Sequence, residues 1–175
     1  MLILIISLLK ILDNWSLDGF NAYIICPHLA GGYGGSWSNA TTLGHLNNLL
    51  DHFIKENKID PEKVMLSGHS LGGLGSMYVA YHSPNRYSSL AVMSGYHPGI
   101  DLNGIKIPTV GYVGTPGAGE DSSSYNFTVG TFKKRFGEEN TFVRSTSHGA
   151  VPRVAFTEDS NKDNKSDLME WMLSQ

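Results

Sequence analysis

The sequence predicts an α/β fold, with a mostly parallel sheet and helices on both of its faces, formed as one domain by residues 1–175. Short apolar runs typical of buried strands alternate along the chain with stretches whose apolar residues recur at helical spacing, as expected of βαβ units. The chain has 41% hydrophobic and 17% charged residues and neither an internal repeat nor a linker, which indicates one folded core.

In the first part of the chain, strands are expected over residues 1–6 and 20–26, with a helix over 8–19 between them. The glycine-rich stretch over 30–39 matches neither dinucleotide-binding nor P-loop spacing, and we interpret it as a connection or as the rim of a substrate site. A long amphipathic helix, capped by Thr41 or Thr42, follows. Its apolar stripe consists of Leu43, Leu46, Leu49, Leu50, Phe53 and Ile54.

In the second part, a strand beginning at Val64 leads into a helix that ends near His82. Further strands are expected over 89–93, 107–113 and 141–144, and loops over 95–104, 114–124 and 157–165. Two more helices are expected, one ended by Gly137 and one around Trp171 that closes the chain.

The stretch Gly68-His69-Ser70-Leu71-Gly72 fits the G-x-S-x-G pattern of a nucleophile elbow. In that motif a serine sits at the tip of a sharp strand-to-helix turn, and its small neighbours let the strand and helix backbones nearly touch. Three fixed positions also occur by chance, but an apolar strand before the motif and an amphipathic helix after it supply the required context. We therefore predict Ser70 as a nucleophile rather than a structural serine.

Composition and charge argue against several other classes of protein. The formal net charge is −3 and no basic run occurs, so no nucleic-acid partner is expected. The single cysteine, Cys26, excludes an internal disulfide and is expected to be a buried small side chain. The apolar run over 1–9 is too short for a membrane span and lacks the basic start of an export signal, so we predict a cytoplasmic protein, with export left open.

A serine nucleophile needs a base, and histidine suits that role near neutral pH. Among seven histidines, His148 is preferred because it follows the last expected strand, and the base comes late in the chain order of this motif. His28, His69 and His97 are placed near the site, whereas His45, His52 and His82 are expected to be solvated.

The third member should be a carboxylate at a strand end between the serine and the histidine. Glu120 and Asp121 both follow the strand expected over 107–113, and Asp101 follows the preceding strand. Asp121 is preferred for its shorter side chain, Glu120 is kept as the alternative, and Asp101 is the weakest candidate. The carboxyl ends of parallel strands share one edge of the sheet, so these groups are expected to converge with Ser70.

The chain resembles the α/β-hydrolases, in their esterase-like and prolyl-oligopeptidase-like branch. The resemblance lies in the elbow Ser67–Gly73, in the segments 82–87 and 91–95, and in the late pair His148-Gly149, and it covers most of the chain from about Phe20. It implies a three-layer α/β-hydrolase sandwich with Ser70, Asp121 and His148 as nucleophile, orienting acid and base.

One departure from that family concerns the oxyanion hole. Family members open with two further strands and then carry a glycine-containing loop that supplies one donor, whereas here the strand expected over 1–6 runs almost directly into a helix. We therefore expect an N-terminally shortened form in which the Leu71 N–H is one oxyanion donor and ester hydrolysis is weak.

These features predict a serine hydrolase that cleaves a small carboxylic ester without metal or cofactor. The alternatives are a peptidase of the prolyl-oligopeptidase type and a non-catalytic α/β-hydrolase-like protein. No membrane partner is expected, and the oligomeric state and the acyl and alcohol groups of the substrate are left open.

Overall fold

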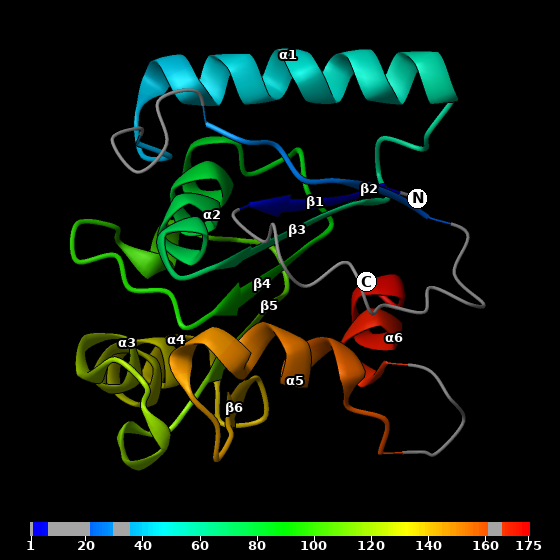
Figure 1. Ribbon diagram of the computed structural model, residues 1–175. Coiled ribbons are helices and arrows are strands. Elements are labelled where there is room, and N and C mark those ends of the chain that lie inside the picture. The colour runs from blue at the N-terminus through cyan, green and yellow to red at the C-terminus, as the bar shows by residue number, and fades with distance from the viewer. Residues whose placement is uncertain (1, 7–21, 30–35, 161–165) are drawn as a thin grey trace.

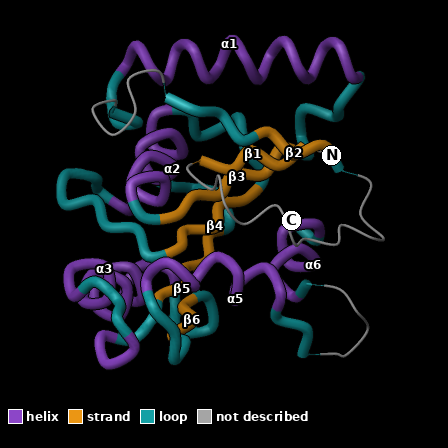
Figure 2. Tube along the Cα trace, viewed as in Figure 1, coloured by secondary structure: helices purple, strands orange, loops and turns teal. Residues whose placement is uncertain are grey.

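The computed structural model describes residues 2–6, 22–29, 36–160 and 166–175, and the strands within them form one parallel sheet in the order β2-β1-β3-β4-β5-β6 (Figure 1). The strands are β1 Leu2–Ile6, β2 Tyr23–Ile25, β3 Val64–His69, β4 Ser89–Met93, β5 Thr109–Val113 and β6 Thr141–Val143. Every neighbouring pair is parallel, which confirms the predicted fold class. Parallel strands must be joined by crossovers, and most of these crossovers contain helices (Figure 2).

The longer helices are α1 Ala40–Asn57, α2 Leu71–His82, α5 Val151–Thr157 and α6 Asp167–Leu173. A helical run follows β5 and consists of α3 Ser122–Phe127, a π-helical turn Thr128–Phe132 and α4 Lys133–Phe136. Short 3-10 turns lie at Leu102–Gly104, Pro116–Ala118 and His148–Ala150. Among these described helices, none is long and apolar enough to cross a membrane.

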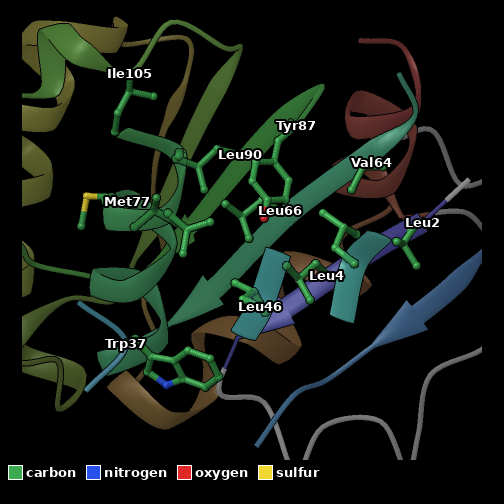
Figure 3. Packing of buried hydrophobic residues seen from close by; sticks show 14 of the residues in the cluster. Leu2, Leu4, Trp37, Leu46, Val64, Leu66, Met77, Tyr87, Leu90 and Ile105 are labelled. Atoms are coloured by element: carbon green, nitrogen blue, oxygen red, sulfur yellow. The ribbon is translucent and has the colours of Figure 1, made fainter. Parts of the chain in front are cut away.

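Side chains alternate between the two faces of the sheet, so the molecule has two apolar layers. Leu66 of β3 packs in the core shared with α1 and α2, which Figure 3 shows, while its neighbour Met65 packs in the core shared with α5 and α6. Figure 1 accordingly shows α1 and α2 on one side of the sheet and α5 and α6 on the other. Strands buried on both faces explain the nearly continuous apolar runs in the sequence.

Three local predictions are changed by the structure. The cap of α1 is Asn39, whose Oδ1 accepts a hydrogen bond from Thr42 N at 2.8 Å, rather than Thr41 or Thr42. The stretch expected to be a loop over 114–124 contains the start of α3, and the helix α5 was not predicted. Both helices are short, seven residues or fewer, and give little periodic signal.

Other local predictions concern the loops and the amino-terminal part. The helix before Gly137 ends there as predicted, with Gly137 at a φ of 98°. Trp37, in the stretch interpreted as a connection or a substrate rim, is buried in the core. Cys26 is half-buried and free, and burial raises the pKa of its thiol. The helix expected over 8–19 lies outside the described residues.

Candidate active site

Ser70 occupies the sharp turn between β3 and α2. Its φ is 55° and its ψ is −120°, a conformation that is energetically unfavourable for a residue with a side chain. The Ser70 N–H donates to the Met93 carbonyl at 2.9 Å, which ties the turn to β4. A Cβ atom on Gly68 would lie 2.1 Å from the Gly72 carbonyl oxygen, so the elbow backbone closes only around a glycine. The residues therefore form the geometry that the G-x-S-x-G spacing predicts.

His148 follows β6, in the first position of a 3-10 turn, and its ring reaches the serine. His148 Nε2 lies 2.9 Å from Ser70 Oγ, and Nδ1 lies 2.5 Å from Glu120 Oε1. An ionised carboxylate only accepts hydrogen bonds, so the proton of the neutral ring belongs on Nδ1 and leaves Nε2 free to accept from the Ser70 hydroxyl. The His148 side chain is 29% exposed, so the serine–histidine pair is open to a substrate.

Glu120 lies between β5 and α3, and its side chain is fully buried. Besides the His148 ring, it accepts hydrogen bonds from Ser94 Oγ at 2.6 Å, from Gly114 N at 2.8 Å and from Asp121 N at 2.8 Å. Burial alone raises the pKa of a carboxyl group, but these hydrogen bonds, that of Ser94 foremost, outweigh it and hold the pKa of Glu120 below its usual range. Glu120 is thus an ionised carboxylate facing the His148 ring.

Asp121, the acid preferred from the sequence, forms a helix cap and is not the carboxylate hydrogen-bonded to the His148 ring. Its side chain is exposed, and its Oδ2 accepts a hydrogen bond from Ser124 N at 2.8 Å, which makes it the N-cap of α3. That bond is the main reason why the pKa of Asp121 is lowered. The structure therefore places Glu120, the alternative, and not Asp121 against the His148 ring. An aspartate three residues before Ser124, at the start of a helical stretch, is itself an N-cap signal that points to this arrangement.

The Leu71 N–H lies directly after Ser70, in the first turn of α2, where backbone N–H groups have no partner within the helix. The Leu71 side chain is 55% exposed, so this end of the helix is accessible. A second donor in such sites comes from the loop after a neighbouring strand. The neighbour here is β1, in which Ile6 is in register with Gly68, and the segment that follows it, 7–21, lies outside the described residues.

Most of the remaining candidates lie away from this group. Asp101 caps the 3-10 turn at Leu102, with its Oδ1 2.9 Å from Asn103 N. His28, His45, His52 and His82 are exposed, and His97 packs near Tyr78. Within the described ranges, no group of three His, Cys, Asp or Glu side chains is arranged to hold a metal ion.

Two further residues contact the site: His69, which the sequence placed near it without a partner, and Ser94, which the sequence did not assign to it. His69 Nε2 lies 2.9 Å from the His148 backbone oxygen, and Ser94 donates to Glu120. The burial of His69 lowers its pKa to about 4, so its ring is neutral near pH 7. His69 occupies a variable position of the elbow motif, so the motif does not predict its contact. Its partner, His148, lies 79 residues away in the sequence.

Comparison with known proteins decides the family. The profile of the Esterase family, described as "Putative esterase", matches residues 30–164, which is more than half of the chain. The chain belongs to the Esterase family. One curated relative, acyl-protein thioesterase 1 homolog 2 from Dictyostelium discoideum, is 33% identical over 73 residues, covering 40% of this chain and 33% of that protein. The chain thus matches about a third of the length of this relative.

Three solved structures with similar folds are named as esterases or as a serine hydrolase. A thermostable esterase superposes with a TM-score of 0.68 at 16% identity, covering 99% of this chain and 54% of that one. Est1E from Butyrivibrio proteoclasticus gives 0.66 at 13% identity, with 99% and 88% covered. An α/β serine hydrolase without a lid from Xanthomonas campestris gives 0.54 at 14% identity, with 87% and 74% covered. The resemblance to α/β-hydrolases predicted from the sequence is confirmed for this member of the Esterase family.

Proposed function

We propose that this chain hydrolyses carboxylic esters, with Ser70 as nucleophile, His148 as general base and Glu120 as the acid that orients His148. The observation that carries the proposal is the continuous hydrogen-bonded chain Ser70–His148–Glu120, at the carboxyl ends of β3, β6 and β5. Membership of the Esterase family supports the same reaction class. A nucleophile, a base in contact with it and a third group that orients the base form the arrangement required for covalent acyl transfer.

The proposed reaction begins when Ser70 Oγ attacks the ester carbonyl while His148 Nε2 takes the hydroxyl proton. The positive imidazolium is stabilised by the Glu120 carboxylate on its other nitrogen. The negative oxygen of the tetrahedral intermediate accepts a hydrogen bond from the Leu71 N–H, next to the positive end of the α2 dipole. His148 then returns the proton to the departing alcohol, and a water molecule activated by the same ring hydrolyses the acyl-serine.

Thioesters are a second candidate substrate class. The observation that favours them is the local match of 33% identity to an acyl-protein thioesterase homologue. A thiolate leaves more easily than an alkoxide, so the same three side chains can cleave either bond. Parallel assays with p-nitrophenyl acetate and with an acetyl thioester of a small thiol distinguish the two classes, and a matched anilide tests for the peptidase alternative.

Labelling with a fluorophosphonate tests whether the serine is activated at all. The wild-type chain and the control Ser145→Ala, which changes an exposed serine near His148, are expected to react and to hydrolyse p-nitrophenyl acetate. Ser70→Ala is expected to lose both the labelling and at least about 10³-fold of the turnover, while its melting temperature stays close to that of the wild type. Equal labelling of Ser70→Ala, or no labelling of the wild type, contradicts the proposal and favours the non-catalytic alternative.

A further inference from the structure

Ser94 directly follows β4, in a backbone conformation that is unusual for a serine. Its φ is 46°, in the left-handed region that glycine enters more easily than residues with a Cβ atom. Its N–H donates to the Tyr112 carbonyl at 2.8 Å, and its carbonyl accepts from Ser124 Oγ at 2.9 Å. The residue is only 1% exposed, so both backbone groups are held in place within the molecule.

The Ser94 hydroxyl is directed at the buried carboxylate of Glu120. Ser94 Oγ donates to Glu120 Oε2 at 2.6 Å, and Gly114 N donates to the same oxygen at 2.8 Å. The other oxygen, Oε1, accepts from Asp121 N and lies against the His148 ring. Donors on both oxygens fix the plane of the carboxylate, and they determine which oxygen faces His148.

We infer that Ser94 is a positioning residue for Glu120: its hydroxyl holds the carboxylate in the orientation that meets His148. The inference rests on the proposed function for its effect on turnover. Glycine suits the backbone of position 94 better than serine does, and the hydroxyl is the group that glycine cannot supply. The energetic cost of the positive φ of Ser94 is therefore offset by the hydrogen bond from its hydroxyl to the Glu120 carboxylate.

The charged state of Glu120 provides a readout that separates this role from a purely structural one. The titratable groups around Glu120 are the His148 ring, the neighbouring Asp121, whose side chain caps α3, and His69, whose Nε2 contacts the His148 backbone oxygen. Among the contacts that lower the pKa of Glu120, the hydrogen bond from Ser94 has the largest effect. Removal of the hydroxyl should therefore raise this pKa, which the titration of Glu120 measures directly.

Three variants test the inference. Ser94→Ala and Ser94→Gly both lose the hydroxyl, but only glycine relieves the left-handed backbone. Ser89→Ala is the matched control, because Ser89 is a buried serine of β4, the strand that Ser94 follows, and its hydroxyl has no hydrogen-bond partner in the described part of the chain. The measurements are kcat and KM for p-nitrophenyl acetate across pH, thermal unfolding, and the titration of Glu120 followed by NMR with carboxyl-labelled glutamate.

Both Ser94 variants are expected to lose about tenfold in kcat with KM within about twofold of the wild type, as for one lost charge-assisted hydrogen bond. Both should move the Glu120 titration to higher pH, whereas Ser89→Ala should leave both kcat and that titration unchanged. Wild-type kcat in Ser94→Gly, or an unmoved Glu120 titration in both variants, overturns the inference. If the wild type shows no Ser70-dependent turnover, the proposed function fails, and the Glu120 titration alone decides the role of Ser94.

Discussion

His69 Nε2 lies 2.9 Å from the backbone oxygen of His148, and the two rings are 4.8 Å apart between their centroids. A carbonyl only accepts hydrogen bonds, so the neutral His69 ring carries its proton on Nε2. The His69 side chain, adjacent in sequence to Ser70, thereby ties the end of β3 to the backbone of His148. Glu120 thus holds the His148 ring, and His69 holds the His148 backbone. Together they fix the proposed base at its distance from the proposed nucleophile.

His69→Phe is expected to lower kcat about tenfold with little change in KM, because it keeps a ring but removes the donor to the His148 carbonyl. His69→Gln retains an N–H donor and should recover part of the loss. The control is His45→Phe, which changes an exposed histidine of α1 and should leave kcat unchanged. Steady-state kinetics on p-nitrophenyl acetate measure the effect, and a fully active His69→Phe enzyme contradicts it.

The lowered pKa of His69 also predicts a loss of stability in mild acid. The imidazole takes up a proton near pH 6.5 in the unfolded chain but only at about pH 4 in the folded one. Between these values the unfolded state binds more protons, so the free energy of unfolding falls as the pH is lowered through this window, by up to about 3 kcal/mol.

Urea unfolding of the wild type and of His69→Phe at a series of pH values measures this contribution. The phenylalanine variant cannot bind this proton, so the stability difference between the two proteins should shift in favour of the variant as the pH falls from about 6.5 to about 4. Parallel stability curves over that range would show that His69 titrates normally in the folded protein.

Glu120→Gln and Asp121→Asn should separate the two neighbouring acids. Glu120→Gln replaces the buried carboxylate that faces His148 and is expected to lower kcat by about 10⁴-fold, as for loss of the orienting acid in serine proteases. Asp121→Asn keeps an N-cap oxygen on an exposed residue and should change kcat less than about twofold. Turnover of p-nitrophenyl acetate by both purified variants gives the comparison. A larger loss of kcat in Asp121→Asn than in Glu120→Gln would identify Asp121 as the acid that orients His148.

Gly68→Ala is expected to destabilise the chain by about 3 kcal/mol or more. The added Cβ would lie 2.1 Å from the backbone oxygen of Gly72, and a backbone atom cannot rotate away as a side chain can. Gly44→Ala is the opposite case, because Gly44 lies within α1 with nothing within 4 Å of its added Cβ, and alanine should stabilise the helix by about 1 kcal/mol. Chemical denaturation of both variants checks the contrast, and equal effects would contradict it.

The sequence by itself determined the features that arise from neighbouring residues. The alternation of strand and helix patterns predicted the parallel sheet, and the boundaries of β4 agree with those expected. The spacing Gly68-x-Ser70-x-Gly72 predicted the elbow, because the close approach of two backbones leaves room only for small residues. The late position of His148 pointed to the histidine that contacts Ser70.

Only the tertiary structure decided which side chains surround that histidine. Glu120 and Asp121 are adjacent in the chain, and the start of α3 turns one toward His148 and makes the other a helix cap. The contacts of Ser94 with Glu120 and of His69 with His148 join residues 26 and 79 positions apart. Such contacts depend on how strands β3 to β6 lie side by side, and a local pattern carries no information on which buried oxygen a distant donor will reach.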